Sequence, residues 1–202
     1  MVQIDRLPEK VNLLATVQPW IDRGFTEDLL LVIPPGAPLS PYSNLTTAHC
    51  GKTPGLPTPD GWVGHRGWTR ENVSRETLKQ RLATLAGAPF SLGLQARRFH
   101  AFDVDTDDLE FARRVYHHLK PIIDRCGLGI RVGKAPGFLV PFRLMEPRHK
   151  ARISFVHEIL GSGSAVEMLG QGQQYVIQGK HPKTGQPYRW YPLDKPPEFL
   201  AP

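Results

Sequence analysis

The sequence has few cysteines and no long apolar run, and each absence excludes classes of protein. Cys50 and Cys126 are too few and too far apart for a disulfide framework or a Cys-x-x-Cys motif. No apolar stretch approaches the roughly 20 residues of a membrane-spanning helix. The start, residues 1–6, lacks the basic and apolar segments of a signal peptide. We therefore expect no membrane contact and a cytosolic compartment in which thiols stay reduced.

Basic residues outnumber acidic ones in this chain. Lys and Arg number 25 against 19 for Asp and Glu, which gives a formal net charge of +6. This excess suits a nucleic-acid or nucleotide partner, and charge alone is equally compatible with a mildly basic enzyme. With 202 residues, of which 40% are hydrophobic, the chain is long enough for one sizeable domain and short for two. We treat 1–202 as one domain with a proline-rich tail over 192–202.

The hydrophobic pattern predicts an α+β fold: a mainly antiparallel sheet with helices against it. Helices are expected over 5–23, 71–86 and 107–124. Strands are expected over 29–33, 90–94, 99–105, 129–132, 138–143, 153–156, 165–169, 173–177 and 188–190. Strand 90–94 is predicted to form a hairpin with 99–105, and 165–169 with 173–177 forms the last clear pair.

Two of the helices have readable ends and faces. Ser74 is the expected N-cap of the second helix, and Leu78, Leu82 and Leu85 form its apolar face. The third helix is expected to be capped by Asp107 or Thr106. Its inward residues are predicted to be Leu109, Ala112, Val115, Tyr116 and Leu119, with His117 and His118 on the surface.

Residues 34–70 are dense in Pro, Gly, Ser and Thr and are predicted to form a long loop. A structureless loop of this length in a compact domain is usually functional or mobile. Trp62 and Trp68 indicate that parts of it pack against the rest of the protein.

The most informative motif is Asp103-Val104-Asp105, at the end of an apolar strand. Because side chains alternate along a strand, the two carboxylates point to the same side. Like charges repel and persist best around a cation, and magnesium takes oxygen ligands of this kind. The motif therefore predicts a metal platform. The alternative is that such acidic residues only cap the following helix, as Asp107 and Asp108 also would.

Later residues strengthen the metal interpretation. Glu167, between Val166 and Met168 on an apolar strand, would supply a third acidic ligand, or is an ordinary residue of an edge strand. Two-metal chemistry on phosphates needs carboxylates that hold ions about 3.5–4 Å apart, and cations for the phosphate tail. A basic set follows the acidic pair: Arg131, Lys134, Arg143, Lys180 and His181.

The sequence leaves the role of three basic residues undecided between two interpretations. Arg131 faces the site or the opposite side of its strand. His181 contacts the ligand or lies in a solvent-exposed loop. Lys52 reaches a phosphate or the template, or is merely solvated. The other histidines show no zinc-ligand spacing with the cysteines.

Segments in a fixed order carry a family resemblance. They are Gly51-Lys52-Thr53-Pro54, Asp60-Gly61-Trp62, Pro89-Phe90-Ser91-Leu92-Gly93-Leu94, Phe102-Asp103-Val104-Asp105, Val166-Glu167-Met168-Leu169-Gly170-Gln171-Gly172, Gly179-Lys180-His181-Pro182-Lys183-Thr184-Gly185 and Tyr188-Arg189-Trp190. Together they resemble the amino-terminal catalytic domain of bifunctional DNA primase/polymerases, of the archaeo-eukaryotic primase superfamily. This type occurs on phages, plasmids and integrated elements.

The resemblance implies a fold and a set of metal ligands. The family fold is a small RRM-like sheet unit joined to a second small α/β subdomain, with the active site in the cleft between them. Asp103 and Asp105 would form the first motif and Glu167 the third, and they would bind Mg²⁺ or Mn²⁺. One ion would activate a 3′-hydroxyl, and the other would bind the triphosphate and stabilise the leaving pyrophosphate.

The chain departs from the family at the second motif. The usual Ser-x-His is absent from 131–139, and Lys134 and Arg143 fit the Lys-x-Pro form with a following Arg that phage-type members carry. Lysine is an effective point charge for phosphate. By the resemblance, Arg131, Lys180 and His181 complete the nucleotide contacts, and Lys52 contacts DNA.

The sequence thus predicts a DNA-templated nucleotidyltransferase that makes or extends primers in phage or plasmid replication in a bacterial cell. Its partners would be single-stranded DNA, nucleoside triphosphates, and a helicase or helical accessory domain. Two rivals remain: a non-catalytic single-stranded nucleic-acid-binding module, which the missing histidine favours, and a metal-dependent nuclease.

Overall fold

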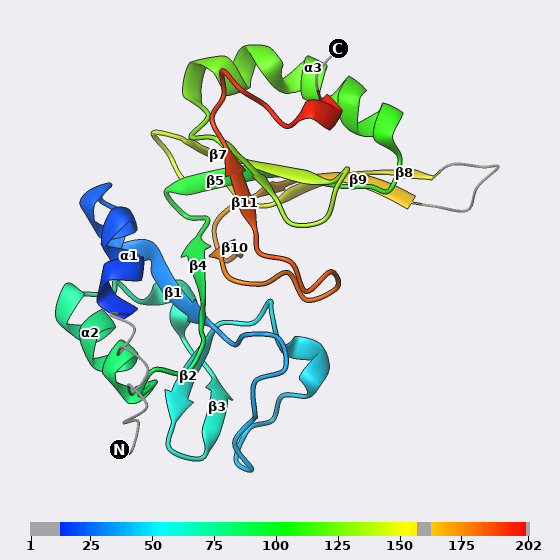
Figure 1. The fold of residues 1–202 in the computed structure, drawn as a ribbon. Coiled ribbons are helices and arrows are strands. Elements are labelled where there is room, and N and C mark those ends of the chain that lie inside the picture. The colour runs from blue at the N-terminus through cyan, green and yellow to red at the C-terminus, as the bar shows by residue number, and fades with distance from the viewer. Residues whose placement is uncertain (1–12, 157–162, 201–202) are drawn as a thin grey trace, which may run out of the picture.

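The strands form two antiparallel sheets and a separate hairpin (Figure 1), in a computed structural model that describes residues 13–156 and 163–200. The three-stranded sheet has the order β1 (Leu29–Val32), β4 (Ser91–Gln95), β10 (Gln174–Gln178). The six-stranded sheet has the order β11 (Arg189–Tyr191), β6 (Ile130–Val132), β7 (Phe138–Arg143), β5 (Phe99–Asp105), β9 (Gly163–Leu169), β8 (Ala151–Val156). Helices α1 (Leu13–Asp22), α2 (Arg75–Thr84) and α3 (Leu109–Cys126) pack beside them. The predicted α+β class and the antiparallel pairing are confirmed.

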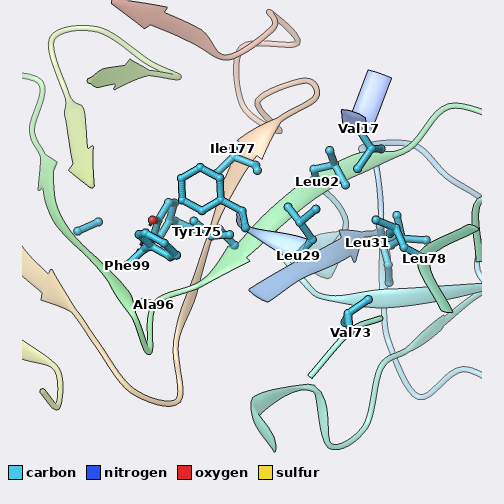
Figure 2. Packing of buried hydrophobic residues seen from close by; sticks show 14 of the residues in the cluster. Val17, Leu29, Leu31, Val73, Leu78, Leu92, Ala96, Phe99, Tyr175 and Ile177 are labelled. Carbon is cyan, nitrogen blue, oxygen red and sulfur yellow. Dashed lines mark hydrogen bonds between the residues drawn. The ribbon is translucent and has the colours of Figure 1, made fainter. Parts of the chain in front are cut away.

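The three-stranded sheet and the first two helices share one apolar core (Figure 2). Val17 of α1, Leu78 of α2 and Leu31 of β1 belong to the same buried cluster. The Ser74 hydroxyl accepts a hydrogen bond from the Thr77 N–H, so the predicted cap of α2 is confirmed. Leu78, Leu82 and Leu85 are buried, as their spacing predicts. The part of the first predicted helix that precedes residue 13 lies outside the described residues.

Helix α3 covers one face of the six-stranded sheet (Figure 1). Ala112, Tyr116 and Ile123 are buried against a cluster that includes Val104 and Val140. The N-cap is Asp108 rather than Asp107 or Thr106, because the Asp108 carboxylate accepts the N–H groups of Glu110 and Phe111. The helix therefore begins one residue after Asp108, and Leu109 in its first turn is exposed rather than inward.

The predicted hairpin of 90–94 with 99–105 does not form, and the last two clear strands, 165–169 and 173–177, lie in different sheets. β4 pairs with β1 and β10, whereas β5 pairs with β7 and β9 in the other sheet. From β4 onward the chain changes sheets three times, between β4 and β5, between β9 and β10, and between β10 and β11. The first two connections lie together, since the Ala96 N–H donates to the Gln173 carbonyl oxygen at 2.8 Å. All five residues of β4 are buried, so it is a central strand and not one arm of a hairpin.

The predicted long loop contains regular structure. Strands β2 (Gly55–Thr58) and β3 (Gly61–Gly64) pair across Pro59 and Asp60, and Trp62 is buried in the first core. Gly61 has φ +119° and its Cβ position is filled by backbone atoms, so a side chain would not fit there. Short 3-10 helices lie at Thr47–His49, Trp68–Arg70 and Glu198–Leu200.

The proline-rich tail packs back on α3. Leu200 is buried there, and the Arg113 guanidinium donates to the Phe199 carbonyl oxygen. Within the described residues, no helix combines the length and the apolar character that a membrane span requires.

Candidate functional site

One row of residues crosses the six-stranded sheet at the level of the acidic motif. In antiparallel pairs, directly opposite residues share a face of the sheet. Glu167 of β9 is directly opposite Asp103 of β5, and Arg131 of β6 is opposite Leu139, which is itself opposite Asp103. The register therefore places Asp103, Glu167 and Arg131 on the face away from α3. Asp105, two residues along β5, lies on the same face.

These side chains open on a cavity of about 330 Å³ where the two sheets meet. Most of the predicted site residues line it: Asp103, Asp105, Glu167, Arg131, Lys134, His181 and Lys52. Tyr175 and Val176 of β10 form the wall from the three-stranded sheet. The open alternative for Arg131 is thereby decided, because its strand presents it to the cavity.

The structure does not bring Arg143 and Lys180 to this cavity. Arg143 is opposite Phe99, four residues before Asp103, and its guanidinium carbon lies 5.9 Å from the centre of the Phe99 ring. Lys180 is exposed, and its backbone forms a bridge with Pro187. The strand register, which local sequence does not reveal, separates Arg143 from the acidic pair.

Among the described acidic residues, Asp103 is the one whose ionised form is disfavoured by its surroundings. Burial raises the pKa of the Asp103 carboxyl, the charges of Asp105 and Glu167 raise it further, and Arg131 opposes them. The Arg131 Nη2 atom lies 4.0 Å from Asp103 Oδ1. A carboxylate held beside other carboxylates is stabilised by a bound cation, so this environment favours metal binding.

Glu167 has basic partners that the sequence did not indicate. Its two carboxylate oxygens lie 2.6 Å from Arg152 Nη1 and 3.0 Å from Lys150 Nζ. Arg152 of β8 is directly opposite Glu167, and only this long-range pairing brings the two together. Across the cavity, Lys134 makes a similar ion pair with Asp107.

The residues of the cavity have the right chemistry for a divalent ion, and their positions meet the needs of such a site in part. Asp103, Asp105 and Glu167 offer carboxylate oxygens to one cavity, which is what Mg²⁺ and Mn²⁺ take. Over 13–156 and 163–200, no three acidic, imidazole or thiol groups are close enough to enclose an ion. Asp103 and Asp105 are thus the available donor pair. Glu167 joins them only if it exchanges Arg152 and Lys150 for the ion.

A cluster of cations surrounds His181, which also lines the cavity. Burial lowers the pKa of the His181 imidazole, and the charges of Arg131, Lys52, Lys183 and Lys134 lower it further. The Thr184 N–H donates to His181 Nδ1 at 3.3 Å, which leaves Nε2 protonated in the neutral ring. Several cations around one pocket suit a polyphosphate.

Sequence reasoning missed two residues of this cluster. Lys183 lies in the same turn as His181, so its position in that motif was an available signal. The Tyr188 ring lies 4.6 Å from the Arg131 guanidinium carbon and lines the cavity. A Cβ atom on Gly133 would lie 2.4 Å from the Tyr188 ring and 2.8 Å from that of His181. Glycine at this position therefore allows both rings to approach the strand.

The chain matched no protein-family model and no curated protein when its sequence was compared with them.

Proposed function

We propose that this protein is the catalytic domain of a DNA primase/polymerase that transfers nucleotides with Mg²⁺ or Mn²⁺. The observation that supports this best is that one cavity is lined by both kinds of group. Its carboxylates are Asp103, Asp105 and Glu167, and its cations are Arg131, Lys52, Lys134 and Lys183, whose charges all act on His181. Carboxylates that hold ions next to cations that hold phosphates are what two-metal nucleotidyl transfer requires.

The arrangement of elements supports the proposal from the fold. Strand β5, helix α3 and strands β6 and β7 follow one another in sequence, and β5 lies between β7 and β9 in the sheet. Because β7 also lies between β5 and β6, which α3 connects, this is a split β-α-β arrangement, one half of the β-α-β-β-α-β plan of an RRM-like unit. Among the described residues between β7 and β9, strand β8 is present where that plan has its second helix. The cavity, with Lys52 and β10 contributed by the other half, would be the active-site cleft.

The proposal assigns each group a role. Asp103 and Asp105 would hold the ions, with Glu167 as the third ligand. When bound, the ions supply Lewis-acid activation of a 3′-hydroxyl and stabilisation of the leaving pyrophosphate. Lys134, Arg131, Lys183 and His181 would hold the triphosphate, and Lys52 the template or a phosphate.

The test is extension of a labelled primer on single-stranded DNA with Mg²⁺ or Mn²⁺ and deoxyribonucleotides or ribonucleotides. Asp103→Asn keeps the volume of the side chain and removes its charge, so we expect a loss of about 100-fold or more in rate. Asp124→Asn is the matched control, because Asp124 is exposed on α3 and pairs only with Lys120 among the described residues. Equal activity of Asp103→Asn and wild type would refute the assignment.

A second candidate is a non-catalytic module that binds single-stranded nucleic acid. The observation in its favour is that Arg152 and Lys150 already neutralise Glu167. A non-catalytic module should bind DNA without metal-dependent incorporation of nucleotides, and Glu167→Gln should leave that binding unchanged. The same assay without nucleotides tests for a nuclease, which would shorten the labelled strand.

A further inference from the structure

A second cavity, of about 690 Å³, lies next to the candidate active site. Tyr175 lines both cavities. The second one is at the other end of β5, where Phe99 lies on the same face of the sheet as Asp103. Trp190 lines it, and Trp190 is directly opposite Arg131 of the first cavity. The proposed roles above make no use of this second cavity.

Aromatic rings form much of its wall. The rings of Trp20 and Trp190 lie 5.6 Å apart, and those of Phe25 and Phe99 lie 4.4 Å apart. The Trp20 N–H donates to the Gln178 side chain at 3.0 Å, and the Trp190 N–H donates to the Ile177 carbonyl oxygen at 2.8 Å. These bonds fix both indoles and occupy their N–H groups. A ligand in the cavity would therefore meet the carbon surfaces of the rings.

Two arginines give this aromatic cavity a positive charge. The guanidinium carbon of Arg23 lies 5.9 Å from the Trp20 ring centre, and that of Arg143 lies 5.9 Å from the Phe99 ring centre. Both side chains are exposed. Among the described residues, no carboxylate lines the cavity, and neither arginine forms an ion pair. Arg97 and Arg98, by contrast, are paired with Asp28.

We infer that this aromatic cavity binds bases of the single-stranded template, an inference that rests on the proposed polymerase function. Bases stack on aromatic side chains, and arginine binds phosphates and stacks as well, so a wall of this composition complements a single strand. Four residues of strand separate Phe99 from Asp103, which is about 13 Å at 3.3 Å per residue. A few nucleotides of template would span that distance.

The first experiment measures binding of a fluorescein-labelled oligothymidylate by anisotropy, without metal or free nucleotide, over a range of salt concentrations. Each phosphate contact on a single strand contributes about 0.7 to the slope of log K against log salt. We expect the double variant Arg23→Gln, Arg143→Gln to lower this slope by about 1.4 and to weaken binding. Arg114→Gln, on the exposed surface of α3, is the matched control and should leave the slope unchanged.

The second experiment tests the stacking surface. Trp20→Leu should weaken oligonucleotide binding about 5-fold or more, and Trp20→Phe should restore most of the affinity because it keeps a ring. If the arginine and tryptophan variants bind the oligonucleotide like wild type, the inference is overturned. If free thymidine monophosphate competes with the oligonucleotide at equal concentration, the cavity binds a free nucleotide instead, which also overturns it.

These outcomes separate this inference from the proposed function. If the wild-type protein extends primers and the variants bind DNA as well as it does, the inference about the aromatic cavity fails and the proposed function stands. If the wild-type protein neither binds the oligonucleotide nor extends primers, both the inference and the proposed function fail.

Discussion

At the scale of single residues, Asp103 is placed where its own ionisation is disfavoured. Its pKa is raised by burial and by the carboxylates of Asp105 and Glu167, with Arg131 acting in the opposite sense. The folded protein therefore holds the Asp103 proton at pH values at which the unfolded chain has lost it. The resulting destabilisation is absent at pH values below the ordinary pKa of 3.8 and is complete above the raised pKa.

The consequence is a prediction about stability. Asp103→Asn cannot ionise, so at neutral pH and without divalent ions its urea midpoint should lie above that of the wild type. Mn²⁺ should then raise the wild-type midpoint and leave that of the variant unchanged, because a ligand stabilises only the state that binds it. Urea unfolding at pH 7, with and without Mn²⁺, measures both effects. A lower midpoint for the variant in the absence of metal would contradict the account of Asp103.

At the scale of elements, features that depend on one strand could be predicted from the sequence, and features that depend on the pairing of distant strands could not. Asp103 and Asp105 lie on one face because alternation along a strand is a local property. That Glu167 is opposite Asp103, and Arg143 opposite Phe99, depends on register between segments that are far apart in sequence. Local pattern therefore placed Asp103 and Asp105 on one face, as the structure has them, but it grouped Arg143 with the cavity residues and did not indicate Lys150 and Arg152.

The wrong hairpin, 90–94 with 99–105, has a related cause. Strands that follow one another in sequence usually pair, and short connections favour that expectation. Here the connection from β4 to β5 contains Arg97 and Arg98, and both guanidinium groups donate to the fully buried Asp28 just before β1. This ion pair ties the connection to the start of β1, at the point where the chain leaves the three-stranded sheet for the six-stranded one.

The ion pair leads to a prediction for Asp28. Removing one partner from a buried ionic group costs about 3–5 kcal/mol. Arg98 keeps its ion pair with Glu27, and Arg97 keeps its hydrogen bond to the Glu27 carbonyl oxygen, so the low end of that range applies. Asp28→Ala should therefore lower the free energy of unfolding by about 3 kcal/mol in urea denaturation. Asp124→Ala, which breaks the exposed pair with Lys120, should change it by less than about 1 kcal/mol. Similar values for the two variants would show that Asp28 does not hold the connection.

At the scale of the whole molecule, carboxylates from the six-stranded sheet and cations from that sheet and from loops line one cavity. The six-stranded sheet supplies Asp103, Asp105 and Glu167, and loops from both halves supply Lys52, Lys134 and Lys183 around His181. No single segment of the sequence contains this arrangement, since Lys52 and Lys183 are brought together only by the folding of both sheets. The surplus of basic residues thus has a specific location beside the carboxylates, where it suits a ligand that carries both phosphates and metal.

This charge distribution makes the protonation of His181 a reporter of nucleotide binding. Its pKa is below the ordinary value because of burial and the four surrounding cations, so the imidazole is neutral at pH 7. A bound triphosphate would compensate those cations, and the pKa of His181 would rise. Nucleotide binding should then take up a proton and become tighter as the pH falls from 7 to 6. An NMR titration of the imidazole signals, with and without a non-hydrolysable triphosphate, measures the shift. The His117 signal, from the exposed side of α3, is the internal control, and a His181 signal that does not respond to the triphosphate would place the phosphates elsewhere.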